Sequence, residues 1–372
     1  MPVCEEKPKY QIVLDWLLER IQSGAYQEGQ QIPTENELSQ QFSVSRQTVR
    51  QAISKLEADG RVERTRGSGT FVRNYAKPSL SDAAVSRKNH RIGVITTYLD
   101  DYVFPSIING IEQTLAVHEY VVILGITYNK PSLERRALEK FRATGVDGII
   151  IEGTQSALPT PNAALLDEFR KANIPMVFIN GTYQDASDSY VIMDDILSGQ
   201  LLTQFLAKKG HRHIGGIFKS DDIQGVKRYE GVMHGAQQNH LDFQEEATFW
   251  YTTEDLPDMF SEVFDPIFAR RMQNVSAMIC YNDEIAVKLI ARLRRLGKNI
   301  PEDYSIVSFD NSSLADPNVF DLTSITYPAF DIGKTAAQIL LRCLENPQNI
   351  EKIKFTPQLI ERNSSAALQS SK

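Results

Sequence analysis

The chain has 372 residues and a formal net charge of −7 at pH 7. This length exceeds one compact core and predicts two or three folded units. No apolar run is long enough to span a bilayer, and the charged N-terminus lacks a signal-peptide core, so we expect no membrane association and a cytoplasmic location. Three distant cysteines without metal-ligand spacing predict a reduced protein with no metal and no cofactor: Cys4, Cys280 and Cys343.

The N-terminal region predicts three helices. Residues 10–21 are amphipathic and form the first. Thr34 and Glu37 have the spacing of a capping box that begins the second. Ser45 can cap the third, with Val44 and Val49 placed for a hydrophobic staple.

The third helix separates an apolar face from a polar face. Its apolar residues recur at helical spacing: Val49, Ala52, Ile53 and Leu56. Arg46, Gln47 and Arg50 therefore point away from the core near the start of the helix. Guanidinium and amide groups in this position suit the edges of DNA bases in a major groove.

A hairpin is predicted to follow over residues 62–72. Its turn, Arg66-Gly67-Ser68-Gly69, combines a cation with two glycines that tolerate positive φ. Residues 41–73 hold seven Lys or Arg against three Asp or Glu, a local charge of +4 in an acidic chain. This local basic character favours a DNA-binding module joined to a larger domain.

Residues 10–72 resemble the winged-helix DNA-binding domain of the GntR family of bacterial transcription regulators. The resemblance rests on Pro33, Glu35, Leu38, Ser45-Arg46, Val49-Arg50, Ala52, Leu56, Gly60 and the run Gly67 to Val72. It implies that Arg46 and Arg50 contact bases and phosphates and that the wing approaches the minor groove. The residues expected to bind double-stranded operator DNA are Glu35, Ser45, Arg46, Gln47, Thr48, Arg50, Arg66, Gly67, Ser68 and Gly69.

The sequence pattern changes after a short connecting segment. Residues 74–90 have few large apolar side chains and a Lys-Pro break, which indicates a linker. We therefore predict a winged-helix domain over 1–73, a linker over 74–90 and an effector domain over 91–372. From Arg91 short apolar runs, each expected to precede a helix, begin near residues 91, 120, 146, 174, 213, 276 and 304. This alternation predicts parallel βα units arranged in two lobes.

Polar residues follow many of these strands, where parallel sheets place ligands. They include Thr97-Tyr98, Glu152, Asn180, Lys219, Asp221-Asp222, Tyr281-Asn282-Asp283 and Asp310-Asn311. We interpret Asp283 as a helix N-cap in preference to a ligand contact, and Asp194 or Asp195 as another cap. His211 and His213 are expected in a surface turn.

Residues 91–362 resemble the effector-binding domain of LacI/GalR-type repressors, which is related to periplasmic sugar-binding proteins. The supporting motifs are Gly110-Ile111-Glu112, Asp194 with Gly199, Lys209 to Ile214, Arg228 to Gly231, Cys280 to Ala286, and Pro301 to Val307 with Asp310. The resemblance implies two lobes that close on a small molecule. A GntR-type head replaces the helix-turn-helix and hinge helix usual in that family.

This combination of head and body is similar to the arabinose-responsive repressors of bacteria. The similarity is close over Thr96 to Ile108 and over Gly216 to Arg228. It implies a homodimer that binds operator DNA, represses arabinose-utilisation genes and is released by L-arabinose. The helix expected over residues 106–119 is a candidate dimer surface.

The expected cleft has the chemistry of a neutral sugar site. Carboxylates accept hydrogen bonds, cations donate them, amides do both and aromatic rings stack on sugar C–H groups. The residues predicted to bind the effector are Tyr98, Tyr102, Phe104, Glu152, Asn180, Lys219, Arg228, Asn282 and Asp310. These features do not distinguish a pentose from a hexose, so an effector other than L-arabinose stays open. An enzyme that uses Glu152 and Asp310 as an acid/base pair is the alternative from another class.

Overall fold

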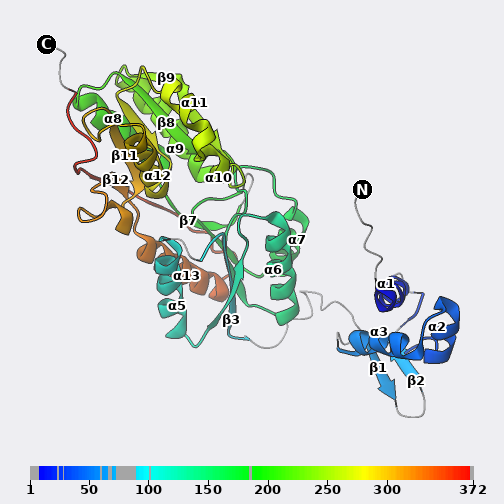
Figure 1. The fold of residues 1–372 in the computed structure, drawn as a ribbon. Coiled ribbons are helices and arrows are strands. Elements are labelled where there is room, and N and C mark those ends of the chain that lie inside the picture. The colour runs from blue at the N-terminus through cyan, green and yellow to red at the C-terminus, as the bar shows by residue number, and fades with distance from the viewer. Residues whose placement is uncertain are drawn as a thin grey trace. The chain divides into compact units, whose positions relative to one another are not determined.

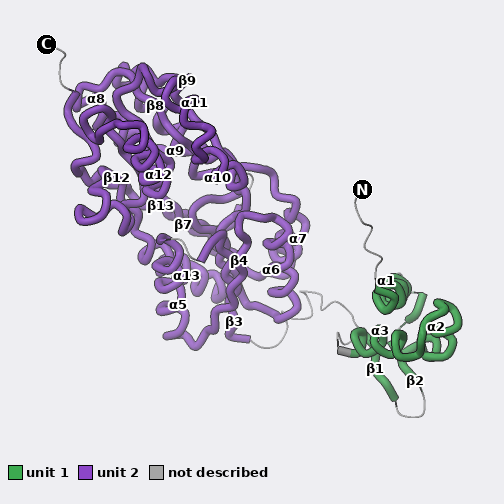
Figure 2. The backbone as a smooth tube through the Cα atoms, viewed as in Figure 1, with its two compact units in different colours: residues 1–82 green, residues 83–372 purple. Residues whose placement is uncertain are grey.

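The structure, a computed structural model, describes residues 8–22, 25–27, 29–58, 61–65, 69–72, 89–99, 102–183 and 187–368. The chain divides into two compact units, residues 1–82 and residues 83–372 (Figure 2). No helix in the described ranges is both long enough and apolar enough to span a membrane.

The first unit is a winged helix-turn-helix. Its elements are α1 (Lys9–Gln22), α2 (Glu35–Phe42), α3 (Arg46–Ala58), β1 (Val62–Thr65) and β2 (Gly69–Val72). The predicted capping box is present: Thr34 N donates to Glu37 Oε2 at 2.7 Å, and Glu37 N donates to Thr34 Oγ1 at 3.3 Å. Strands β1 and β2 pair antiparallel, as the hairpin prediction requires. The three helices and the hairpin share one apolar core that contains Leu17, Leu38, Val49, Leu56 and Val72.

The second unit consists of two lobes, each built on a six-stranded sheet (Figure 1). The first-lobe sheet has the order β13-β7-β6-β5-β3-β4 and is entirely parallel. Its strands are β3 (Arg91–Thr96), β4 (Val121–Ile126), β5 (Gly148–Glu152), β6 (Met176–Ile179), β7 (Ser189–Met193) and β13 (Lys352–Phe355). Its helices are α5 (Phe104–Ala116), α6 (Pro131–Thr144), α7 (Ala163–Lys171) and α13 (Ala329–Glu345).

The second-lobe sheet has the order β14-β12-β11-β10-β8-β9 and is parallel except for β14. Its strands are β8 (His213–Lys219), β9 (Asp242–Tyr251), β10 (Ala277–Cys280), β11 (Ser305–Asp310), β12 (Thr323–Thr326) and β14 (Leu359–Ile360). Its α-helices are α8 (Asp195–Lys208), α9 (Ile223–Gln238), α10 (Leu256–Met259), α11 (Asp265–Arg271) and α12 (Asp283–Arg295). Two 3₁₀ helices complete it, η1 (Glu262–Phe264) and η2 (Ser313–Ala315).

The parallel α/β architecture predicted from the alternating pattern is therefore confirmed. One detail of the pattern is wrong: β6 leads directly into strand β7, and β11 leads through η2 into β12, without an intervening α-helix. The chain passes between the lobes three times, after β7, after β12 and after β13.

Each lobe contains one pair of helices in close contact, α5 with α13 and α8 with α9 (Figure 1). Glycine makes this approach possible. A Cβ atom on Gly231 of α9 would lie 2.1 Å from the backbone oxygen of Ile196 in α8. A Cβ on Gly333 of α13 would lie 2.0 Å from the backbone oxygen of Ile107 in α5. Any larger residue would force the paired helices apart.

The predicted linker lies largely outside the described residues, which resume at Asn89. Asn89 N donates to Asp147 Oδ1 at 2.9 Å, and Asn89 Nδ2 donates to Gly145 O at 2.7 Å. The end of the predicted linker is thus hydrogen-bonded to the first lobe.

Candidate functional site

The exposed face of α3 carries the side chains that the sequence predicts to point outward. Arg46, Gln47 and Arg50 are exposed, whereas the predicted apolar stripe is buried: Val49, Ala52, Ile53 and Leu56. This separation leaves two cations and an amide on the first two turns of the helix, where a major-groove reader needs them.

Arg50 is held by a carboxylate of the preceding helix. Its Nε donates to Glu35 Oε1 at 3.2 Å, and its NH2 donates to Glu35 Oε2 at 2.9 Å. The hydrogen bond from Arg50 lowers the pKa of Glu35. The Arg50 side chain is nevertheless 61% exposed. The pair therefore orients Arg50 and adds little stability, since exposed ion pairs are worth at most about 1 kcal/mol.

Ser45 and Thr48 complete the start of α3. Thr48 N donates to Ser45 Oγ at 3.1 Å, which is the predicted cap, and their hydroxyl oxygens lie 2.8 Å apart. Gly69 opens β2 with φ +124°, a conformation that favours glycine. The other predicted wing contacts, Arg66, Gly67 and Ser68, lie outside the described residues.

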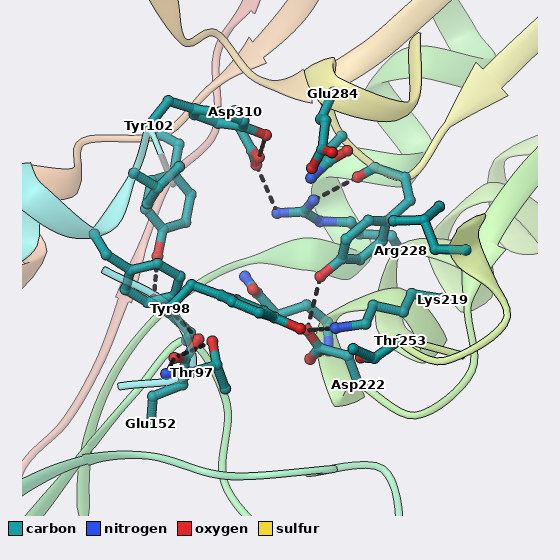
Figure 3. A pocket seen from close by; sticks show the side chains of 18 of the residues that line it. Thr97, Tyr98, Tyr102, Glu152, Lys219, Asp222, Arg228, Thr253, Glu284 and Asp310 are labelled. Atoms are coloured by element: carbon teal, nitrogen blue, oxygen red, sulfur yellow. Dashed lines mark hydrogen bonds and ion pairs between the residues drawn. The ribbon is translucent and has the colours of Figure 1, made fainter. Parts of the chain in front are cut away.

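A cavity of about 530 Å³ lies between the two lobes (Figure 3). All the residues predicted to bind an effector line it: Tyr98, Tyr102, Phe104, Glu152, Asn180, Lys219, Arg228, Asn282 and Asp310. Most of them follow the carboxyl ends of strands β3, β5, β6, β8, β10 and β11. Converging strand ends therefore bring together residues separated by more than 200 positions in the chain.

Arg228 lies at the centre of the second-lobe wall. Its Nε donates to Asp195 Oδ1 at 3.0 Å, and its NH2 donates to Asp310 Oδ1 at 3.0 Å. Its NH1 donates to the backbone oxygen of Tyr281 at 2.6 Å. The guanidinium carbon lies 4.7 Å from the ring centre of Phe309. Only 4% of the side chain is exposed, so this cation is held rigidly within the protein.

Burial disfavours the charged forms of Arg228 and its carboxylate partners. Burial raises the pKa of Asp195 to about 6, although Arg228 acts in the opposite direction. Burial also disfavours the charged form of Arg228, but Asp310 and Asp195 outweigh it, so the pKa of Arg228 lies well above its usual value. Arg228 consequently remains a cation and depends on both carboxylates.

Glu152 forms the first-lobe acceptor. Its Oε2 accepts from Thr97 N and from Thr97 Oγ1, both at 2.7 Å, and its Oε1 accepts from Asn180 Nδ2 at 2.9 Å. The Tyr327 hydroxyl donates to Asn180 Oδ1, which fixes the orientation of that amide. Burial raises the pKa of Glu152 to about 7.

Lys219 lies beside two carboxylates in the wall opposite Tyr98 (Figure 3). Its Nζ is 3.9 Å from both Asp221 Oδ1 and Asp222 Oδ2. Burial alone would lower the pKa of Lys219, but Asp222 and Asp221 outweigh it and the pKa is raised. The lysine therefore stays charged and can donate to a ligand oxygen.

Hydrogen bonds join the lobes around the cavity. Tyr102 Oη of the first lobe donates to Asp310 Oδ2 of the second at 2.8 Å. Asn129 Nδ2 donates to Asp221 Oδ2 at 2.8 Å. Ile223 N donates to Ser156 Oγ at 3.1 Å. These contacts tie the two lobes to each other beside the cavity.

Two cavity residues have unusual backbone conformations. Asn180 has φ +64° and Asp310 has φ +100°. Asparagine tolerates the first value, whereas the second costs a non-glycine residue on the order of 1–3 kcal/mol. Strain of this kind concentrates where a side chain must be aimed for function, and Asp310 is aimed at Arg228.

Three expectations about neighbouring residues meet different outcomes. Asp194 caps α8, as predicted, and accepts from Leu197 N at 3.0 Å. The expectation for Asp283 is wrong, because Asn282 caps α12 by accepting from Ile285 N, while Asp283 is buried against serines. His211 is also not on a surface turn: it is buried, beside Ser276 Oγ at 2.7 Å.

Several lining residues escaped the sequence analysis as effector contacts. They are Val103, Gln224, Tyr251, Thr253, Leu256, Glu284, Ser313, Leu314 and Tyr327, with Thr97, Asp222 and Tyr281 noted only as polar residues at strand ends. Gln224 lies within α9, and Tyr327 lies in the passage between the lobes, so neither directly follows a predicted strand. Only the N-cap spacing of Asp222 ahead of α9 could have pointed to the helix start that presents Gln224.

The buried acid Glu152 predicts a pH dependence of stability. The unfolded chain has the usual glutamate pKa of about 4.3, and the folded value is about 7. Between these values the folded protein binds more protons than the unfolded chain, so stability falls as the pH rises through this window. We expect Glu152→Gln to flatten the slope in urea unfolding measured from pH 5 to 8.

Part of the pH dependence of stability should remain in Glu152→Gln, because burial also raises the pKa of Asp195 and of Asp283 to about 6. An unchanged slope in Glu152→Gln would show that Glu152 titrates alike in the folded and unfolded states. Asp303→Asn, on an exposed turn, serves as the control and should leave the slope as it is.

Comparison with known proteins identifies the family. Residues 9–72 match bacterial regulatory proteins of the gntR family, and residues 203–365 match the periplasmic binding protein-like domain. An arabinose metabolism transcriptional repressor of Geobacillus stearothermophilus is 37% identical over 365 residues, covering 96% of this chain and 97% of the relative. The chain belongs to this family of transcriptional repressors.

A second relative of the repressor has the same description. The arabinose metabolism transcriptional repressor of Halalkalibacterium halodurans is 35% identical and covers 98% of each chain. A solved LacI family transcriptional regulator from Enterococcus faecium with bound ribose is 26% identical, with a TM-score of 0.60, and covers 75% of the repressor and all of the solved chain. The repressor is therefore not an enzyme, and the acid/base alternative for Glu152 and Asp310 is set aside.

Proposed function

We propose that the repressor binds double-stranded operator DNA as a homodimer and releases it when L-arabinose enters the cavity between the lobes. Repressors act on the chromosome, so we place the protein in the cytoplasm. The observation that carries the proposal is near full-length similarity to two arabinose metabolism repressors, together with a cavity of matching chemistry.

The proposed operator contacts lie on the head. Glu35, Ser45, Arg46, Gln47, Thr48 and Arg50 line the start of α3 or support it. The further contacts we propose are the residues of the predicted wing turn, Arg66, Gly67, Ser68 and Gly69. Two heads in a symmetric dimer would reach successive major grooves of a near-palindromic site. We keep the domain limits at 1–73, 74–90 and 91–372, and we retain the α5 region as a dimer surface.

The proposed effector contacts are the nine predicted residues of the cavity. Glu152 and Asp310 accept hydrogen bonds, Lys219 donates them, and the rings of Tyr98 and Tyr102 provide flat apolar surface. A sugar shifts the repressor only by its difference in affinity for two lobe arrangements. Such coupling is typically about 1–3 kcal/mol.

A repressor that responds to a different neutral sugar is the second candidate. The solved Enterococcus faecium regulator contains ribose, another pentose, on the same fold. Calorimetric titration of the full chain with a panel of pentoses and hexoses separates the two. L-arabinose should bind most tightly, and tighter binding of another sugar would replace it as the effector.

Release of DNA is tested separately. A duplex selected from random sequences by the repressor can be labelled and followed by fluorescence anisotropy. L-arabinose should lower its apparent affinity by about 5- to 150-fold, the range expected for allosteric coupling. An unchanged affinity with saturating sugar would contradict the proposal.

A further inference from the structure

Most hydrogen-bond donors of the cavity are already used within the protein. Arg228 donates from Nε, NH1 and NH2 to Asp195, Tyr281 and Asp310. The hydroxyl of Tyr281 donates to Asp222 Oδ2 at 2.7 Å. The hydroxyls of Tyr102 and Tyr327 donate to Asp310 and Asn180. Lys219 can donate to one ligand oxygen. A second sugar oxygen that needs a donor must find it among groups not yet paired.

Gln224 offers such a donor. It lies in the first turn of α9, where its backbone N donates to Asp222 Oδ1 at 3.0 Å. The residue is only 7% exposed and lines the cavity. Among the residues that the structure describes, none pairs with the buried side-chain nitrogen, Nε2. A buried amide without a partner is costly, so its retention beside a cavity calls for a ligand.

The other buried atoms without a hydrogen-bond partner in the described ranges do not point to this ligand. Asp221 Oδ1 has Lys219 Nζ at 3.9 Å. Arg292 Nε and NH1 belong to a guanidinium that faces Asp265 and stacks on Phe268, away from the cavity lining. Gln224 is therefore distinguished by its position as well as by its free amide.

We propose that Gln224 is a specificity-determining residue that donates from Nε2 to one oxygen of the bound sugar. The inference rests on the proposed function and adds a contact to it. The carboxylates of Glu152 and Asp310 select sugar hydroxyls that donate, whereas Gln224 selects an oxygen lone pair. A sugar hydroxyl can meet either kind of group, but the ring oxygen only accepts, so it can face Gln224 and not a carboxylate. This difference favours the orientation that turns the ring oxygen toward Gln224.

Gln224→Met tests the inference, since methionine matches the length of glutamine without its amide. In calorimetric titrations of the full chain, we expect the affinity for L-arabinose to fall about 5- to 100-fold, the loss of one buried hydrogen bond. Gln237→Met, an exposed position at the end of the same helix, is the matched control and should bind as the wild type does. Without sugar, Gln224→Met should melt no lower than the wild type, because it removes an unpaired buried group.

Sugar analogues locate the contacted oxygen. Each protein is titrated with monodeoxy analogues and with the carbocyclic analogue that lacks the ring oxygen. One analogue should bind the wild type more weakly than the parent sugar does, but should bind Gln224→Met as well as the parent sugar does. The substitution and the missing sugar oxygen then remove the same hydrogen bond. Equal losses for every analogue in both proteins would overturn the inference.

The outcomes separate the two proposals. If the wild type binds another sugar of the panel instead, L-arabinose is rejected and the same analogue series on that sugar tests Gln224. If the wild type binds no sugar, both proposals fail. If the wild type binds sugar and Gln224→Met binds it equally well, the inference alone fails.

Discussion

Arg228→Ala should abolish sugar binding and lower the free energy of unfolding of the second unit by about 3–5 kcal/mol, the cost of breaking a buried ion pair. Two carboxylates depend on this guanidinium, Asp195 and Asp310, each 3.0 Å away. Removing the guanidinium leaves both carboxylates without their cation. The Asp310 side chain also loses the hydrogen bond that orients it in the cavity. Calorimetric titration with L-arabinose measures the first effect, and urea unfolding measures the second.

A second variant separates binding from folding. In the double variant Arg228→Met with Asp195→Asn, the asparagine replaces one of the two carboxylates left without a cation. The methionine fills part of the space that the arginine occupied. This variant should therefore recover stability but not sugar binding. Operator affinity without sugar should stay near the wild-type value in both variants, because the head is a separate compact unit. Normal sugar affinity in a folded Arg228→Ala protein would contradict the assigned role.

Arg50→Ala should weaken specific operator binding by about 1–3 kcal/mol, the value of a bidentate base contact. The Arg50 side chain is 61% exposed, and Glu35 holds its orientation. Because the pair is exposed, the variant should fold with unchanged stability. Fluorescence anisotropy with the selected duplex, and with duplexes carrying single substitutions, measures affinity and specificity together.

Lys55→Ala provides the control for Arg50→Ala, since it removes a cation from the last turn of the same helix. It should lower affinity for all duplexes alike, if at all, whereas Arg50→Ala should also relax the preference at one base. Glu35→Gln should lower affinity less than Arg50→Ala does, because it frees the guanidinium without removing it. Unchanged operator affinity in Arg50→Ala would show that the helix meets DNA through other side chains.

The head could be predicted from sequence almost to the residue, because its signals are local. Thr34 and Glu37 are three positions apart, and Ser45 and Thr48 are three apart, so capping is visible in the sequence itself. The apolar stripe of α3 repeats at helical spacing and faces one small core. Neither signal depends on distant parts of the chain.

The strands of the sheets could be predicted where they read as continuous apolar runs, which includes the edge strand β4. β5 and β6 read as continuous apolar runs because helices cover them on both sides. Strands β9, β13 and β14 lie at sheet edges. β9 mixes exposed with buried residues, β13 is mostly exposed and β14 is half-buried, so no clear apolar run marks them. β7 alternates buried with half-buried residues, and β12 is polar except for Ile325, so neither reads as an apolar run.

The cavity followed from one rule, that parallel strands end at a common edge. The rule gathered Glu152, Lys219 and Asp310 correctly around one space. It could not find Gln224, which lines the cavity from helix α9. The separate expectation of a surface turn for His211 was wrong because its partners, Ser276 and Ala366, are 65 and 155 positions away in the chain.

The three connections between the lobes should make the second unit tolerant of a single backbone cleavage. The connecting segments bond to one another: Asp194 N donates to Phe355 O at 3.0 Å, and Thr326 N donates to Gln358 O at 2.8 Å. A protease cut beside Pro357 would leave two covalent ties, and these bonds would hold the new ends in place. We expect that the unit can then be expressed as two fragments that reassemble.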